Sequence, residues 1–589
     1  MNLVLIFLAA LAVLVLGYVF YGRFLEKSWG IDPARETPSQ DCFDGKDYVP
    51  TPPTLVFGHH FASIASGLGM IGGALCASSF GWLPVLLWLL VGGIFFGAAQ
   101  DFGALFVSLR TKGRSIGYML RERVGERAQR LFSVLALIVL VLLVAVFVSL
   151  LAAVFGETNN VSLVGLGLGK EKLTPIVSFG LGEVSPTSSA ATASILSVLV
   201  ALLFGALAFR KNLPMIPVAI GSVLLLVGSV WLSFYVGINL PPIVWVGVIA
   251  LYLLLASLTP VWALLQPRDF LCACLAGGVM LLGVVALVGA ALGGKVQMTL
   301  PAIAEGAFRP GLLLLAPGGA IFGYHALIAS GTTAKQLANE KHARRVSMGA
   351  MLLNTLLAVV ALLMIGVTGA LEKPVSLDGV LNLLASGMAT AWNALFGGNG
   401  ELVTSGLFYK LVVLALSVFA LTTLDTCVRL ARYLFAELFN PEGRRLKKLE
   451  GAQRFFATPA VGTLIVVVLG CVLGVLLGAD RLWPLFGTAN LLLAALALWS
   501  LSVFFKRSGK TVWALRIPAA VCLLAALYDE ARQAFALTLK LRAGVTDPGD
   551  WVILALSLVL LVLAVLLLVQ LLPRLWKKEQ AQEAADDVD

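Results

Sequence analysis

The chain has 589 residues, of which 59% are hydrophobic and only 13% are charged, and its mean hydropathy is +0.95. About a quarter of the residues of a soluble domain are charged, so this composition excludes an ordinary soluble globular protein and indicates a membrane protein. The net charge of +10 comes mostly from basic connections between apolar runs, so it requires no nucleic-acid partner.

Fifteen apolar runs are long enough to cross about 30 Å of hydrocarbon, which takes about 17–25 helical residues. We therefore expect an all-α polytopic membrane protein with about 15 transmembrane helices, one or two of them re-entrant. The connections 156–189 and 372–404 are too short to be much more than caps over the bundle. In chain order, the predicted spans lie near residues 1–22, 58–76, 82–108, 131–155, 190–209, 213–234, 242–264, 269–292, 310–334, 346–371, 405–437, 455–478, 481–505, 512–535 and 550–572.

Basic residues in the connections predict the orientation of the chain. Most lysines and arginines fall in alternate connections, led by RTKGRSIGYMLRERVGERAQR and NPEGRRLKKLEGAQR, and such connections are cytoplasmic. We therefore expect a periplasmic N-terminus and a cytoplasmic C-terminus. The first span has no basic residue before its apolar run, which favours a retained anchor over a signal peptide. The seven cysteines show no CxxC pair, and we expect them to be reduced.

A short motif occurs twice, in spans of opposite predicted direction. The first copy is FGHHFASIASG at 57–67, and the second is FGYHALIASG at 322–331. Repeated segments of opposite direction, rich in glycine, are typical of transporters built from inverted repeats, whose broken helices bind substrate near the midplane. Close helix packing also favours small residues, so packing is the competing interpretation.

The two copies of the motif supply the candidate binding residues. Imidazole titrates near neutrality, so histidines in these segments can bind substrate or carry a proton, although a lone membrane histidine is more often a packing residue. The candidates are His59, His60, Ser63, Ser66, Gly67, His325, Ser330, Thr332 and Thr333.

Ionisable residues at membrane depth are costly and usually face the interior of the bundle. Asp425 follows Thr422 and Thr423 within one helical turn, so these oxygens can bind a coupling ion, either H⁺ or Na⁺. Asp425 can instead pair with Arg429, because residues four apart share a helix face. Asp101 is a second candidate for proton transfer, about 13 Å from the predicted cytoplasmic boundary on a helix.

Several segments together resemble the carbon starvation protein A (CstA) family. They are DGKDYVPTPPTLVFGHHFASIAS, AAQDF, YHALIASGTTAKQ, FALTTLDTCVRLARYLF and WPLFGTANLLLA, and they span about Tyr21 to Lys506. The resemblance implies a bacterial inner-membrane secondary transporter for peptides or pyruvate, related to the LeuT-like superfamily with its two inverted five-helix repeats. Two positions depart from the family pattern and put the substrate in doubt. GLGMIGGALC follows GHHFASIAS without the expected Gly-Pro, and Leu491 stands where Gln is expected.

We therefore expect a transporter core at 58–506, with broken helices at 58–76 and 310–334. An extra helix at 1–25, C-terminal helices at 512–572 and a cytoplasmic tail at 573–589 would surround it. The expected function is import of small carboxylates, either short peptides or pyruvate, by symport with H⁺ or Na⁺, H⁺ being favoured. No cofactor or metal is expected, and the sequence leaves the oligomeric state open. The alternatives are a redox protein with histidine-ligated haem or metal, and a channel.

Overall fold

The structure is a computed structural model of the 589-residue chain. It describes residues 3–65, 72–73, 76–77, 79–156, 177–179, 184–211, 213–304, 320–368, 377–396, 401–442, 446–544 and 547–576.

The described part of the first half of the chain is helical apart from one small two-stranded antiparallel sheet. The N-terminal rod of α1, η1 and α2 is continuous and ends at Gly30, whose positive φ of 73° lets its N–H bond back to Glu26. The elements are α1 (Leu3–Leu16), η1 (Gly17–Tyr21), α2 (Gly22–Trp29), α3 (Pro38–Asp41), α4 (Pro53–Ala65), α6 (Trp82–Val91), η2 (Gly92–Gly97), α7 (Ala98–Arg110), α8 (Ile116–Arg123), α9 (Glu126–Phe155), β1 (Val177–Phe179), α10 (Pro186–Gly205), η4 (Ala206–Arg210), α11 (Met215–Ser233), β2 (Val236–Ile238), α12 (Pro242–Leu258) and α13 (Leu265–Leu292).

The second half of the described chain is helical throughout. Its elements are α15 (Gly323–Gly331), η5 (Thr333–Lys335), η6 (Glu340–His342), η7 (Arg345–Gly349), α16 (Ala350–Thr368), α17 (Leu377–Phe396), α18 (Glu401–Phe439), η8 (Leu446–Lys448), α19 (Gly451–Ala457), α20 (Pro459–Leu477), α21 (Ala479–Arg507), α22 (Trp513–Arg542) and α23 (Pro548–Trp576).

Eleven helical segments of the described chain are long and apolar enough to cross a membrane, which supports an all-α multi-pass membrane protein. The predicted spans 58–76, 242–264, 310–334 and 512–535 are not among these eleven. The described helices there are α4, α12 and α15, which are short, and α22, which is 30 residues long but carries charged residues such as Asp529 and Glu530. A total of fifteen spanning helices is therefore not established.

One connection was predicted wrongly. Residues 372–404 were expected to form a cap, but they contain the twenty-residue helix α17 and the start of α18. Helix α17 packs against its chain neighbours α16 and α18 and against α13, which is distant in sequence, so it is part of the bundle. The expectation of a cap followed from the short length of this connection, and length does not report which helices pack against it.

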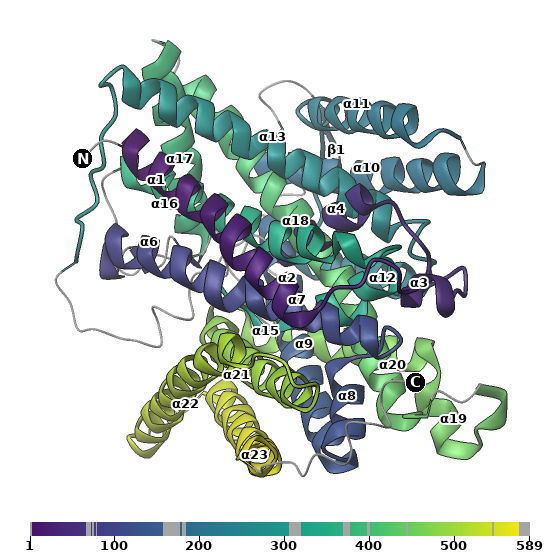
Figure 1. The fold of residues 1–589 in the computed structure, drawn as a ribbon. Helices are drawn as coiled ribbons and strands as arrows, with labels where there is room; N and C mark the ends of the chain where they lie inside the picture. Colours follow the sequence, from purple (N-terminus) through teal and green to yellow (C-terminus); the bar gives the residue numbers. More distant parts are fainter. Residues whose placement is uncertain are drawn as a thin grey trace.

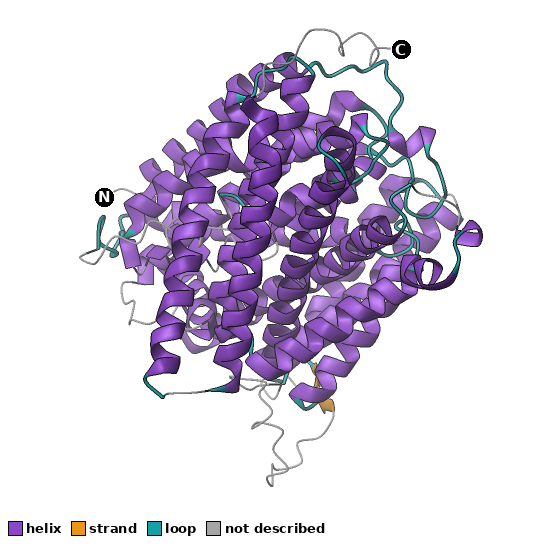
Figure 2. Cartoon of the chain, turned by 90° about the horizontal axis from the view of Figure 1, so that it is seen from below, coloured by secondary structure: helices purple, strands orange, loops and turns teal. Residues whose placement is uncertain are grey.

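The helices form one bundle with central and peripheral members. Figure 2 shows most helices running roughly side by side, with the antiparallel pair of strands β1 and β2 at one end. In Figure 1, α22 and α23 lie at one margin, and α10 and α11 lie at the opposite margin. In the most apolar stretches of α18 and α21, 94% of the residues are buried, whereas in that of α11 only 22% of the residues are buried. Helices with exposed apolar faces are suited to lipid contact, so we place α11 at the lipid boundary.

Two short helices lie in the interior and position the candidate site. Helix α4 packs against α13, α16 and α18, and α15 packs against α7, α18 and α21. The start of α15 approaches α21 so closely that a Cβ on Gly323 would overlap the backbone oxygen of Asn490 and lie 2.5 Å from the nitrogen of Ala494. A residue without a side chain is therefore required at this crossing.

Candidate functional site

The two copies of the repeated motif lie against each other in opposite directions. His59 of α4 contacts Thr332, whereas Ser63, four residues later on α4, lies beside Tyr324 near the start of α15. The order of contacts is thus reversed along the second segment. The hydroxyl of Tyr324 donates at 3.1 Å to the backbone oxygens of Ser63 and Ile64. The antiparallel arrangement expected from the predicted span directions is present in the fold.

His59 is fully buried and joins three helical elements. Its Nδ1 makes a short contact with Oδ2 of Asp269 on α13, and its Nε2 lies 2.9 Å from the hydroxyl of Thr332. That hydroxyl donates to the carbonyl of Ile328 at 3.1 Å, and while it does so Nε2 is the donor to Thr332, because a hydroxyl has only one proton to give. One further proton is then required between Nδ1 and the carboxylate, because two acceptors cannot bond to each other. The His59–Asp269 pair therefore shares one proton between Nδ1 and Oδ2, in addition to the proton on Nε2.

His60 forms a second cluster beside the first. Its Nδ1 lies 2.9 Å from the hydroxyl of Thr333, and its Nε2 lies 3.4 Å from Oδ2 of Asp101 on α7. Both carboxylate oxygens of Asp101 are buried and accept no hydrogen bond from the described residues. His325 is also buried and hydrogen-bonds to the backbone of Ile64. His60, His325 and the Asp101 carboxylate, which accepts no hydrogen bond from the described residues, thus lie together at the α4–α15 contact.

The remaining motif residues have mixed positions. The hydroxyl of Ser63 lies 3.5 Å from Asp269 and 3.2 Å from the hydroxyl of Thr426, so it faces the centre. The hydroxyl of Ser330 donates to the carbonyl of Ala326 within its own helix, and so does not reach the histidines. The candidates Ser66 and Gly67 lie outside the described residues.

Asp425 takes a partner other than the one within its own helix. Its Oδ2 accepts hydrogen bonds from Arg268 at 2.6 Å and from the hydroxyl of Tyr252 at 2.7 Å, and both side chains of the ion pair are at most 2% exposed. Arg429 instead bonds to Asp47. The alternative of an Asp425–Arg429 pair is therefore replaced by a pair between α18 and α13.

The threonines before Asp425 are also buried. Thr422 and Thr423 are both 0% exposed, and the hydroxyl of Thr423 has no hydrogen-bond partner among the described residues. Their oxygens are therefore shielded from solvent, on the same helix as the Asp425 carboxylate.

Sequence reasoning missed three residues of this network, which are Tyr252, Arg268 and Asp269. Arg268 was placed in the connection before the predicted span 269–292, and Asp269 was placed at the first position of that span without a role. The available signal was the pair of adjacent opposite charges in QPRDF, because α13 in fact begins at Leu265 and buries both side chains. Among the described residues, no group of three or more His, Cys, Asp or Glu side chains is placed to hold a metal ion.

The family model described as carbon starvation protein CstA matches residues 2–377 and 370–529. The chain belongs to the CstA family. A CstA relative from Campylobacter jejuni, named a peptide transporter, is 30% identical over 585 residues, which cover 88% of this chain and 78% of that protein.

Two Escherichia coli members of the CstA family are similarly related. The peptide transporter CstA is 29% identical, with 90% of this chain and 81% of that protein covered. The pyruvate/proton symporter BtsT is 28% identical, with 87% and 79% covered. Among solved structures, a mutant of the Eremococcus coleocola manganese transporter has a TM-score of 0.47 and 12% identity, covering 90% of this chain and 99% of that one.

Proposed function

We propose that this CstA-family protein is a secondary transporter that imports a small carboxylate, either pyruvate or a short peptide, together with protons. The observation that carries the proposal is the buried contact of the two antiparallel histidine segments, where the His59–Asp269 pair holds one transferable proton. The names of the relatives, peptide transporter and pyruvate/proton symporter, support the same class.

In the proposed site, substrate binds between α4 and α15. His60 and His325 would donate hydrogen bonds to the carboxylate, with Ser63 and Thr333 beside them, because all four are buried at this contact. Asp101 lies within 3.4 Å of His60 and would take a proton from it during turnover. Substrate that enters the site would then change which of these groups holds the proton. Symport requires this link between substrate binding and proton binding.

The contacts favour H⁺ over Na⁺ as the coupling ion. A Na⁺ ion at Asp425 would have to displace the guanidinium of Arg268 and the hydroxyl of Tyr252 from the carboxylate. A proton on the His59–Asp269 pair displaces nothing. We nevertheless keep Asp425, with Thr422 and Thr423, as a candidate coupling site, because the pair with Arg268 can open during transport.

We further propose that α4 and α15 belong to inverted repeats of the LeuT-like kind, and that rocking of one repeat against the other alternates access. Their antiparallel contact supports this arrangement. The bias of basic residues supports insertion in the bacterial inner membrane with a periplasmic N-terminus and a cytoplasmic C-terminus.

The test is uptake of labelled pyruvate and labelled dipeptides into proteoliposomes, under an imposed pH gradient and, separately, under a Na⁺ gradient. We expect uphill accumulation of one substrate class with the interior alkaline, and none in protein-free liposomes. Accumulation driven only by Na⁺ would overturn the proton assignment, and downhill flux alone would indicate a channel. A Soret band in the absorbance spectrum of the purified protein would instead favour a haem protein.

A further inference from the structure

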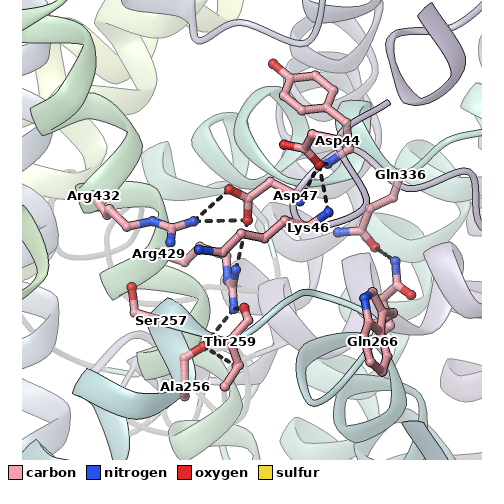
Figure 3. A network of polar contacts seen from close by, with 12 residues as sticks. Asp44, Lys46, Asp47, Ala256, Ser257, Thr259, Gln266, Gln336, Arg429 and Arg432 are labelled. Carbon is pink, nitrogen blue, oxygen red and sulfur yellow. Dashed lines mark hydrogen bonds and ion pairs between the residues drawn. The ribbon is translucent and has the colours of Figure 1, made fainter. Parts of the chain in front are cut away.

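The segment DGKDYVPT at 44–51 crosses one end of the bundle and is attached to three separate elements (Figure 3). The Asp44 carboxylate accepts 2.8 Å hydrogen bonds from the backbone N–H groups of Lys46, Asp47 and Tyr48, which folds the segment into a tight turn. This turn directs the side chain of Asp47 toward α18.

Backbone hydrogen bonds attach the same segment to the rest of the bundle. The N–H of Val261, after α12, donates to the carbonyl of Lys46 at 2.9 Å. The N–H of Thr51 donates to the carbonyl of Gln336, just beyond η5, at 3.0 Å. The 44–51 segment therefore closes the bundle between α12, η5 and α18.

Asp47 is held by two arginines of α18. Arg429 Nη1 donates to Oδ1 at 3.0 Å, and Arg432 Nη2 donates to Oδ1 and Oδ2 at 3.0 and 2.9 Å. These arginines are 1% and 2% exposed, whereas Asp47 is 17% exposed. Arg429 Nη2 also donates at 2.7 Å to the carbonyls of Ala256 and Thr259 at the end of α12. The two arginines are thus held inside the bundle, whereas Asp47, their carboxylate partner, is partly exposed to solvent.

The cradle around Asp47 contains more positive charge than one carboxylate neutralises. Lys335 lies 3.4 Å from the ring centroid of Tyr433, and the Arg432 guanidinium lies 4.8 Å from the same ring. A second carboxylate, Glu437, interacts electrostatically with Lys335 and accepts a hydrogen bond from the hydroxyl of Ser115, which still leaves three cations for two carboxylates. The hydroxyl of Tyr433 interacts with Arg432 and with Asp47; apart from it, Arg429 Nε, Arg432 Nε and Arg432 Nη1 are buried without a hydrogen-bond partner among the described residues. Buried unpaired guanidinium donors are costly, so the cradle can accept further anionic oxygens.

The same helix connects this cradle to the central site. Thr426 contacts Ser63 in the centre, and Arg429 follows it after three residues on α18. The arginines therefore lie on α18 about one helical turn or more beyond the residue that contacts the centre.

We propose that Arg429 and Arg432 form a binding site for a small carboxylate anion, and that Asp47 is a tethered carboxylate which the incoming anion displaces. The exchange replaces one carboxylate by another, so no arginine is left with an uncompensated buried charge. Displacement of Asp47 frees the 44–51 segment and opens this end of the bundle. The assignment of the anion as transported substrate rests on the proposed function.

Acetate binding to the purified full-length protein in detergent tests the site. Asp47→Asn removes the competing carboxylate, so we expect acetate to bind this variant at least about tenfold more tightly than wild type. Asp41→Asn removes the same charge from the exposed part of the same connection and is expected to leave acetate affinity unchanged. Adding Arg432→Gln to Asp47→Asn is expected to abolish the gain. Unchanged or weaker binding by folded Asp47→Asn would overturn the proposal.

Hydrogen exchange in the wild-type protein gives a second test that does not depend on folding of a variant. We expect acetate, at constant ionic strength, to speed exchange at the backbone amides of 44–51, although ligands ordinarily slow exchange. Unchanged or slower exchange would overturn the displacement. Neither measurement needs a gradient. Anion binding without uptake of pyruvate or dipeptides would therefore refute the proposed function and leave the site standing, and normal uptake without anion binding would refute only the site.

Discussion

The ion pair between Arg268 and Asp425 allows a structural role and a coupling role for Asp425 to be separated. Both side chains are at most 2% exposed, and Arg268 already has two buried nitrogens without a partner among the described residues. Asp425→Asn therefore removes the one carboxylate that is hydrogen-bonded to this buried guanidinium, and breaking a buried pair from one side costs about 3–5 kcal/mol. With an unfolding entropy of about 2.1 cal/mol/K per residue, this loss corresponds to a fall in Tm of about 2–4 °C.

The second half of the experiment is the paired variant. Arg268→Gln combined with Asp425→Asn removes both charges, so we expect most of the lost Tm to return, because replacing a buried ion pair as a unit is often neutral. Intrinsic fluorescence during heating in detergent measures Tm, and proteoliposome uptake measures coupling. A role in coupling predicts that the stable double variant still loses accumulation driven by the pH gradient.

Two results would refute this reasoning. An unchanged Tm in Asp425→Asn would show that the carboxylate does not compensate Arg268. Full pH-driven accumulation by the double variant would show that the pair is structural only, and the coupling assignment would then rest on the His59–Asp269 pair.

Further predictions concern proton transfer, packing and pH. Asp269→Asn should reduce pH-driven accumulation at least about tenfold, because the proton shared with His59 is lost. Substrate exchange at equal pH on the two sides should persist. Full accumulation by this variant would contradict the role of Asp269. Gly323→Ala should lower the free energy of unfolding by roughly 1–3 kcal/mol, because the new methyl group meets fixed backbone. Gly221→Ala has open space around its Cβ and should not destabilise the protein. Equal Tm values for the two variants would show that the α15–α21 crossing is loose. Burial raises the pKa of Asp47, but the guanidinium groups of Arg432 and Arg429 lower it more, from 3.8 to about 2. The stability that wild type has over Asp47→Asn should therefore be constant above about pH 4 and lost as pH falls through 2; a difference independent of pH would refute the ion pair.

The fold class and one central contact could be predicted from sequence. Long apolar runs specify membrane helices because backbone polar groups must be satisfied within each segment, and this rule depends only on local sequence. The repeated FG…IASG motif and the predicted span directions together indicated two antiparallel segments, and His59, His60 and His325 indeed meet there.

The partners of the buried charges were decided only by tertiary structure. Helix periodicity identifies residues that share a face, which suggested Arg429 for Asp425, but it says nothing of which other helix faces them. Asp425 pairs instead with Arg268 on α13, and His59 pairs with Asp269, 210 residues away. A charge buried in the bundle must find the nearest opposite charge in three dimensions, and that neighbour is set by how the helices pack.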